Sequence, residues 1–260
     1  MGERTKYAPG TFSWTDLTTT DQPAAKAFYG ELFGWEATDM PAGEGVVYSM
    51  MSIGGKHVAA ISPQPEQQRE AGVPPMWNSY ITVESADAAL EKAKQLGATV
   101  HAPAFDVFEA GRMGVVQDPQ GAFFEVWEPK QHIGASLVNA QGALSWNELA
   151  SPDIEASAGF YRELFGWAVD SMEGMQIPYM TIKTAAGGSN GGIRSAMERE
   201  PPYWLVYFGI DDLDAGLAKA GQLGGTKLMG PMEISPTSRF AVLHDPQGAV
   251  FALYDGDFEA

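Results

Sequence analysis

The chain has 260 residues, a formal net charge of −17 and no cysteine, so it can hold two domains of ordinary size and excludes disulfides, zinc–thiolate sites, iron–sulfur clusters and thiol catalysis. Its negative field repels phosphate groups, so we expect no nucleic-acid partner and no membrane partner. The N-terminus lacks an apolar segment and no apolar run approaches about 18 residues, which favours a soluble cytoplasmic protein.

The first quarter of the chain predicts one strand, one helix and three further strands. Residues 12–18 alternate as a strand does, with four side chains on one face: Phe12, Trp14, Asp16 and Thr18. A helix is predicted over 23–33, with Asp21 in its N-terminal cap and Gly34 at its end. Three strand-like runs follow, at 34–38, 46–53 and 58–61.

The second quarter repeats this order after a pair of prolines. A strand at 78–84 leads to a helix at 85–96, which Ser85 can cap and Gly97 ends. Three more strands are predicted, at 99–105, 112–117 and 122–128. The polar, proline-containing segments 62–73 and 195–202 are predicted to be connectors.

The second half of the chain repeats the first. SWTDLTTTDQPAAKAFYGELFGW at 13–35 recurs 132 residues later as SWNELASPDIEASAGFYRELFGW. PPMW and DPQGA, which begin at Pro74 and Asp118, recur 127 residues later as PPYW and DPQGA. The order βαβββ therefore occurs four times, which predicts an α+β fold made by tandem duplication. We call each of these four units a module and number them 1 to 4 along the chain. We place the first domain at 8–130, a linker at 131–141 and the second domain at 142–256.

Two motifs carry a family resemblance. One is the first strand with its polar turn and FYxELFGW, at 14–35 and 146–167; the other is DPxG before an apolar strand, at 118–127 and 245–254. Together they resemble the vicinal oxygen chelate superfamily, which includes glyoxalase I, bleomycin-resistance proteins and extradiol dioxygenases. WTDL, WNEL and QHIGA are similar to two-domain glyoxalase-like proteins of actinobacteria, among them a culture-filtrate antigen and proteins named hydroxylases. The resemblance implies glyoxalase-like half-barrels, each lined by the inward faces of two modules.

The resemblance also implies metal ligands, which are His, Gln or Glu, on the first and last strand of each module. If modules pair within each half, these positions are Trp14, Ala60, Asn78 and Glu125, and Trp146, Gly192, Leu205 and Ala252. If module 1 instead pairs with module 4, the positions of that site are Trp14, Ala60, Leu205 and Ala252. Module 2 then pairs with module 3, and the positions of their site are Asn78, Glu125, Trp146 and Gly192. Neither arrangement reaches three ligands. We predict no cofactor and no metal, a divalent ion near Glu125 being the alternative.

Carboxylates and arginines are the other polar candidates. Alternation places Asp16 beside Trp14 and Glu148 beside Trp146 on the inward face. A buried, unpaired carboxyl has a raised pKa, as in a general acid or base, while a hydrogen-bonded structural carboxylate is the alternative. Two arginines could neutralise such an acid or bind an anionic ligand, and each lies six residues before its DPQGA motif: Arg112 and Arg239. The four histidines lie away from the ligand positions, and a structural or solvated role is expected for each: His57, His101, His132 and His244.

The remaining inward candidates are mostly aromatic, which suits a flat apolar ligand, with ordinary core packing as the alternative. In the first half they are Trp14, Tyr48, Asn78, Tyr80 and Trp127; in the second they are Trp146, Tyr179, Tyr207 and Tyr254. The candidate catalytic residues are Asp16, Glu125 and Glu148. The first half keeps the more polar set, so we expect the function there.

Three functions fit these residues. The first is a glyoxalase-like protein that binds a small planar or carbonyl-containing molecule without the usual metal. The second is a lyase or a hydroxylase/oxygenase of the same superfamily, using an unusual metal site around Glu125 or acid–base work by Asp16 and Glu125. The third is an interaction protein. Four modules in one chain already contain what single-unit members reach by dimerisation, so a monomer or a homodimer is expected.

Overall fold

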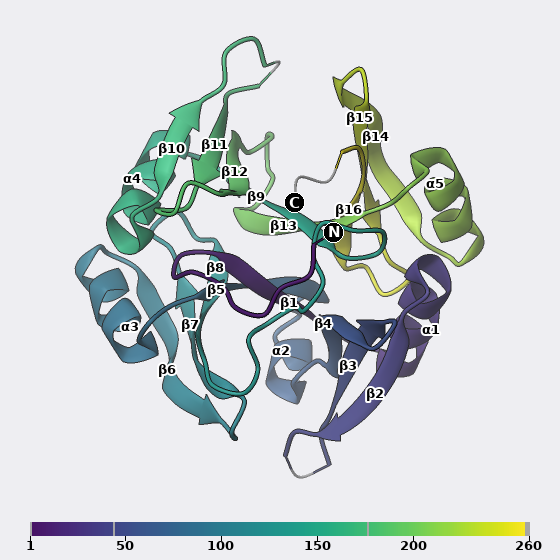
Figure 1. Ribbon diagram of the computed structural model, residues 1–260, viewed down its shortest axis with the longest axis horizontal. Coiled ribbons are helices and arrows are strands. Elements are labelled where there is room, and N and C mark those ends of the chain that lie inside the picture. Colours follow the sequence, from purple (N-terminus) through teal and green to yellow (C-terminus); the bar gives the residue numbers. More distant parts are fainter. Residues whose placement is uncertain (1, 44, 176, 258–260) are drawn as a thin grey trace.

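Each half of the chain forms one eight-stranded mixed sheet in the computed structural model, which describes residues 2–43, 45–175 and 177–257 (Figure 1). The first half contains β1 (Phe12–Thr19), α1 (Gln22–Phe33), β2 (Glu36–Pro41), β3 (Val47–Ile53), β4 (Lys56–Pro63), α2 (Glu66–Glu70), β5 (Met76–Thr82), α3 (Ala86–Gln95), β6 (Thr99–Val107), β7 (Gly111–Gln117) and β8 (Phe123–Pro129). The second half contains β9 (Leu144–Ser151), α4 (Ile154–Phe165), β10 (Ala168–Ser171), β11 (Tyr179–Lys183), β12 (Ser189–Ser195), β13 (Tyr203–Gly209), α5 (Leu213–Gln222), β14 (Thr226–Ser235), β15 (Ser238–His244) and β16 (Val250–Asp255). The predicted α+β duplication is confirmed.

Modules pair within each half, which selects the first of the two arrangements considered above. The first sheet has the order β2-β3-β4-β1-β5-β8-β7-β6, and the second has the equivalent order β10-β11-β12-β9-β13-β16-β15-β14. β1 runs antiparallel to β5, so that Asp16 lies opposite Asn78 and Trp14 lies opposite Tyr80. β5 and β8 are parallel, with Tyr80 beside Glu125.

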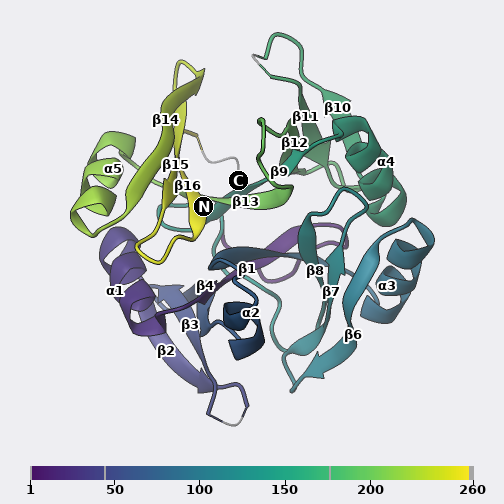
Figure 2. The ribbon, with the colours of Figure 1, turned by 180° about the vertical axis from the view of Figure 1, so that it is seen from behind.

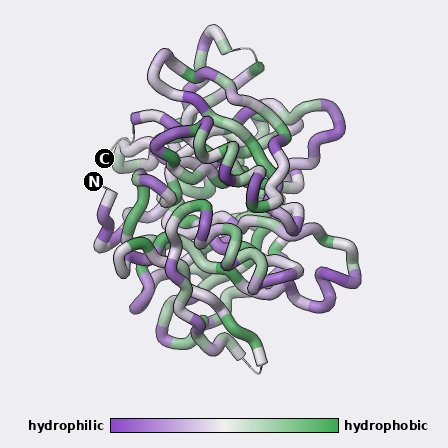
Figure 3. Tube along the Cα trace, turned by 90° about the vertical axis from the view of Figure 1, so that its right-hand side faces the viewer, coloured by the Kyte–Doolittle hydropathy of each residue, from purple (hydrophilic) through white to green (hydrophobic). Residues whose placement is uncertain are grey.

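The two sheets stand back to back; α1, α3, α4 and α5 lie toward the sides of the molecule, and α2 lies nearer its middle (Figures 1 and 2). In the middle, β1 contacts β9 and β5 contacts β13, while α1 contacts α5 and α3 contacts α4. Each main hydrophobic core is therefore shared between the halves: one combines α1 with β13 and β16, and the other combines β5 and β8 with α4. Figure 3 shows hydrophobic segments inside the molecule and many hydrophilic residues on outlying loops.

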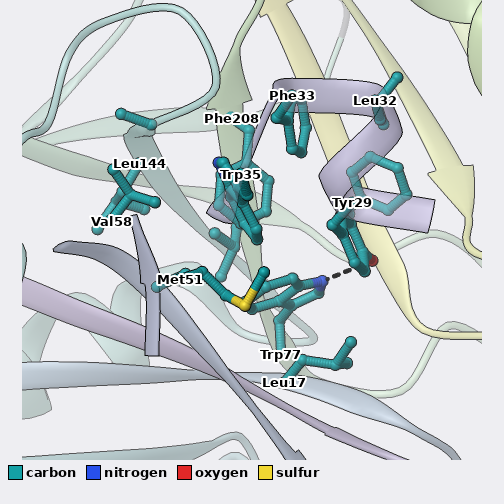
Figure 4. Close-up of a cluster of buried hydrophobic side chains, with 14 of the residues drawn as sticks. Leu17, Tyr29, Leu32, Phe33, Trp35, Met51, Val58, Trp77, Leu144 and Phe208 are labelled. Carbon is teal, nitrogen blue, oxygen red and sulfur yellow. Dashed lines mark hydrogen bonds between the residues drawn. The ribbon is translucent and has the colours of Figure 1, made fainter. Parts of the chain in front are cut away.

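A tyrosine on α1 joins the halves through buried hydrogen bonds. Tyr29 Oη donates to Asp245 Oδ2 in the second half, at 3.1 Å. It accepts from Trp77 Nε1 at 3.0 Å, as Figure 4 shows. Its ring stacks on Trp35, with ring centres 5.6 Å apart. The repeated motifs thus meet at one point: FYxELFGW supplies Tyr29, PPMW supplies Trp77, and the DPQGA of the other half supplies the aspartate.

The duplication builds the same cluster a second time. Tyr161 Oη on α4 donates to Asp118 Oδ2 at 2.9 Å and accepts from Trp204 Nε1 at 3.0 Å. The ring of Tyr161 stacks on Trp167, 5.2 Å between centres. We call these two clusters the tyrosine clamps. Each clamp ties a helix of one half to a turn of the other half.

Two local features differ from the sequence-based prediction. The register of β1 against β5 shifts between Phe12 and Trp14, so Phe12 leaves the face that carries Asp16 and packs against Trp204, 4.8 Å between ring centres. The predicted connector 62–73 contains the short helix α2. Within the described part of the chain, no helix has the length and apolar character that crossing a membrane requires.

Candidate functional site

The face of the first sheet that points away from the junction carries a cluster that we call the first cup. Its members come from β1, β3, β5 and β8: Trp14, Asp16, Tyr48, Asn78, Tyr80, Glu125 and Trp127. Strand alternation sets this face, because the neighbouring residue Leu17 points to the opposite side and is fully buried in the shared core.

Asp16 is the centre of the first cup. Its Oδ2 accepts hydrogen bonds from Tyr48 Oη and Tyr80 Oη, both at 2.9 Å, and its Oδ1 accepts from Asn78 Nδ2 at 2.7 Å. Trp14 Nε1 in turn donates to Tyr48 Oη at 3.0 Å. Burial raises the pKa of Asp16, and these three hydrogen bonds act in the opposite direction. Five of the candidates predicted for this half therefore form one hydrogen-bonded network: Trp14, Asp16, Tyr48, Asn78 and Tyr80.

Glu125 supplies the second carboxyl group of the first cup, and this group has fewer hydrogen-bond partners than the carboxyl group of Asp16. The residue is 6% exposed, and its Oε2 has no hydrogen-bond partner among the described residues. Burial and the nearby charge of Asp16 raise the pKa of Glu125 well above its ordinary value. This favours the neutral form, which carries a proton and can donate it in a hydrogen bond.

A histidine that sequence reasoning placed in the linker completes this cluster. The ring of His132 packs edge-on against Trp14, 4.6 Å between centres, and Trp127 Nε1 donates to His132 O at 2.9 Å. Burial lowers the pKa of His132 to about 4, and the neighbouring His57 adds to this effect. His132 is therefore uncharged at neutral pH. No motif in the sequence signals this contact, since it depends on the path of the linker.

The equivalent face of the second sheet, which we call the second cup, holds an internal ion pair. Arg194 Nε donates to Glu148 Oε1 at 2.8 Å, and Arg194 donates to both oxygens of Glu200 at 2.7 and 2.6 Å. The side chains of Arg194 and Glu148 are 7% and 8% exposed. Sequence reasoning missed Arg194; matching Ser62 on β4 with Arg194 on β12 would have found it.

The rest of the second cup is apolar or aromatic. It lacks a counterpart of Glu125, because Ala252 lies beside Tyr207 where Glu125 lies beside Tyr80. Leu205 faces Glu148 where Asn78 faces Asp16. The pKa of Tyr207 is raised by burial and by the charge of Glu148. Trp146 Nε1 donates to Tyr179 Oη at 3.1 Å, which repeats the Trp14–Tyr48 contact. Asp16 and Glu148 are thus equivalent in position but not in environment.

Neither of the two predicted arginines reaches a cup carboxylate. Arg112 pairs with Asp87 at 2.8 Å and lies 3.6 Å from Asp106, while Arg239 pairs with Asp214 and Asp255. Alternation explains this, because Glu125 faces Val115 across β7 and β8, and Arg112 is three positions away on the other face. The spacing from the DPQGA motif places Arg112 and Arg239 on the strand before that motif, but it does not determine which face of the sheet their side chains occupy.

The residues present do not fit the divalent ion that the family resemblance implies. Within the described residues, no three His, Cys, Asp or Glu side chains come together as a metal site requires. Both oxygens of Asp16 already accept hydrogen bonds, and the indole nitrogen of Trp14 is a donor only. The first cup therefore offers a divalent ion too few free ligands.

Replacing Glu125 with glutamine is expected to change how stability depends on pH. A carboxyl whose pKa is raised by folding stabilises the folded state at low pH, and this contribution is lost as pH rises through the raised pKa. The Glu125→Gln variant should therefore match the wild type near pH 4 and have the higher melting temperature at pH 8. Calorimetry from pH 4 to 9 measures this, with Glu163→Gln on the exposed face of α4 as control. Parallel curves for wild type and Glu125→Gln would contradict it.

Comparison with known families identifies the class of protein. The profile of the Glyoxalase/Bleomycin resistance protein/Dioxygenase superfamily matches residues 11–126, and that of the Glyoxalase-like domain matches residues 147–254. The chain belongs to this superfamily. The match in both halves agrees with the duplication and with the family resemblance of the motifs.

Individual relatives narrow this assignment. The chain is 44% identical to "Putative glyoxylase CFP32" of Mycobacterium tuberculosis, over 97% of each chain. It is 33% identical to "Anthracycline biosynthesis protein DnrV" of Streptomyces peucetius, over 96% of this chain and 95% of that one. Among solved structures, a Mn(II)-bound glyoxalase from Novosphingobium aromaticivorans has a TM-score of 0.67 and 18% identity, covering 100% of this chain and 84% of the other. That likeness shows the fold alone.

Proposed function

We propose that the chain binds a small planar or carbonyl-containing molecule in the first cup without the usual catalytic metal of its superfamily. The observation that carries this proposal is the buried carboxyl of Glu125, whose Oε2 lacks a partner among the described residues. An unsatisfied buried polar group costs about 1–3 kcal/mol, so a ligand that satisfies it gains affinity. A neutral carboxyl can donate to a carbonyl oxygen.

The aromatic side chains of the first cup support a planar ligand. Trp14, Tyr80 and Trp127 are buried, and His132 packs uncharged against both indoles. Rings of this kind favour flat apolar surfaces, while a few fixed polar groups set the orientation of the ligand. Tyr48 and Asn78 are only half-buried, so the side of the cup near Asp16 is the one nearest to solvent.

The names of two relatives support the same ligand class. The Streptomyces peucetius protein is an anthracycline biosynthesis protein by name, and anthracyclines are planar aromatic carbonyl compounds. The mycobacterial relative carries the name glyoxylase, which refers to carbonyl chemistry. A planar aromatic ketone or quinone satisfies both descriptions.

The second candidate function is catalysis on such a ligand, as a lyase or a hydroxylase/oxygenase. It is favoured by the different environments of the two carboxyls: Asp16 accepts three hydrogen bonds, whereas Glu125 accepts none at Oε2. Environments that push two pKa values apart suit one group as acid and the other as base. A product that appears with wild type and not with Glu125→Leu distinguishes catalysis from binding alone.

Tryptophan fluorescence titration with 2-acetylnaphthalene and with naphthalene tests the proposal. We expect saturable binding of the ketone and a loss of about 2- to 12-fold in its affinity in Glu125→Leu, since a net hydrogen bond contributes about 0.5–1.5 kcal/mol. Naphthalene should bind both proteins alike. The control variant is Ala252→Leu, at the equivalent position of the second cup. No saturable binding of the ketone, or an equal loss in Ala252→Leu, would refute a ligand site in the first cup.

A further inference from the structure

Both cups contain a buried carboxyl group at the equivalent position of the first strand, but the groups that surround it differ. In the second cup, the carboxylate of Glu148 is neutralised by the guanidinium of Arg194 from β12. β4 is the equivalent strand of the first sheet: Ala60 lies beside Asp16 as Gly192 lies beside Glu148. Two residues further on, Ser62 stands where the second sheet has Arg194. In the described part of the chain, the first cup therefore lacks the cation that its duplicate contains.

We infer that the ligand of the first cup is an organic cation, a planar molecule with a protonated amine that pairs with Asp16 where the second cup holds the guanidinium of Arg194. This inference rests on the proposed function, because it assumes that the first cup is the ligand site. The proposed function leaves the charge of the ligand open, because binding of a carbonyl group by Glu125 does not depend on that charge; a positive charge is the new element.

Asp16 has room for one more donor. A carboxylate oxygen can accept about two hydrogen bonds, and Asp16 Oδ1 accepts one, from Asn78, among the described residues. No arginine or lysine in the described part of the chain forms an ion pair with Asp16, because Arg112 lies on the opposite face of its sheet. An ammonium group would supply both the missing hydrogen bond and the missing charge.

Glu125 is the independent sign that a ligand belongs in this place. Its buried Oε2 has no partner, and it lies beside Tyr80, whose hydroxyl group reaches Asp16. In the second cup, where the cation is built in, the residue equivalent to Glu125 is Ala252, and the buried polar atom without a partner is the hydroxyl oxygen of Tyr207. Among the described residues, the first cup thus lacks an internal cation and holds an unpartnered carboxyl oxygen, whereas the unpartnered atom of the second cup belongs to a phenol.

The surroundings favour a cation as well. The indole and phenol rings of Trp14, Tyr48 and Tyr80 adjoin Asp16, and aromatic faces attract organic cations. The chain as a whole carries a net charge of −17, which raises the local concentration of cations and repels anions. An anionic ligand would meet the buried carboxyl groups of Asp16 and Glu125, and among the described residues no Lys or Arg forms an ion pair with either group.

Two probes of matched shape test the inference by isothermal titration calorimetry at pH 7. 4-(Aminomethyl)acetophenone carries a positive charge, and 4-(hydroxymethyl)acetophenone is neutral. We expect the amine to bind the wild type at least tenfold more tightly than the alcohol. Asp16→Asn should abolish this preference while the alcohol still binds, which shows that the cup is intact. Asp170→Asn, which removes the same charge from an exposed position on β10, should keep the preference.

The outcomes separate the inference from the proposed function. Equal binding of amine and alcohol by the wild type overturns the inference and leaves the proposed function standing. Binding of neither probe by the wild type overturns both. Ser62→Arg provides a second variant should Asp16→Asn not fold, because it introduces the guanidinium of the second cup into the first. The preference for the amine should then fall at least tenfold, and an unchanged preference in Ser62→Arg overturns the inference.

Discussion

Replacing Arg194 with leucine is expected to lower the free energy of unfolding by about 3–5 kcal/mol, because removal of one partner leaves the other charges of a buried ion pair uncompensated. Glu148 and Glu200 both receive hydrogen bonds from Arg194, and their side chains are 8% and 11% exposed. The loss should show as a lower midpoint in urea denaturation at pH 7.

The pH dependence of this loss identifies its cause. Burial raises the pKa of Glu148, and Arg194 is the main influence that lowers it. Without Arg194, the folded variant binds a proton at Glu148 more readily than the unfolded chain does, so the deficit shrinks as pH falls. Ser62→Ala at the equivalent position of the first sheet is the control and should cost less than about 0.5 kcal/mol. A deficit that does not change from pH 8 to pH 5 would point to lost packing instead.

Replacing Tyr29 with alanine is expected to cost about 3–5 kcal/mol, the usual range for deleting a fully buried aromatic side chain. Tyr29→Phe should cost about 1–3 kcal/mol, since it keeps the stacked ring but leaves Asp245 Oδ2 and the indole nitrogen of Trp77 without their partner. Chemical denaturation followed by tryptophan fluorescence measures both, and Tyr161→Phe in the second tyrosine clamp should cost a similar amount.

The same experiment reports whether the halves unfold together. Both tyrosine clamps cross the junction, so Tyr29→Ala should move one common transition and not produce two. Equal shifts of near-UV and far-UV circular dichroism would establish this. A separate early transition for one half would contradict the shared core and would favour independent domains. The predicted bounds of the domains, at residues 130 and 142, stay a prediction.

Much of the fold could be predicted because its signals are local. The alternation in 12–18, the caps at Asp21 and Ser85, and the motif FYxELFGW each act over a few residues, and the structure has β1, α1 and α3 where these signals place them. The duplication then extended each prediction to the other half. Phe12 was misplaced because one irregularity in the register reverses the face of a side chain.

The candidate site was less accessible because its contacts are not local. The indole–phenol–carboxylate network of the first cup follows from strand alternation, and Asp16, Tyr48 and Tyr80 were all predicted. Arg194 was missed because it lies between the two repeated motifs, where the offset between the halves changes from 132 to 127 residues. His132 was missed because only the tertiary path of the linker brings it to Trp14. In each case a contact between distant segments decided the role of the residue.

The first tyrosine clamp has a consequence for biosynthesis. Tyr29 and Asp245 are 216 residues apart, so the surface of α1 that packs on the second half has no partner until almost the whole chain has been made. An emerging nascent chain would expose Phe28 and Tyr29 during that time, whereas Tyr161 finds Asp118 already synthesised. The left-to-right order of translation thus distinguishes two contacts that are equivalent in the finished molecule, and the first is the one that a chaperone would have to protect.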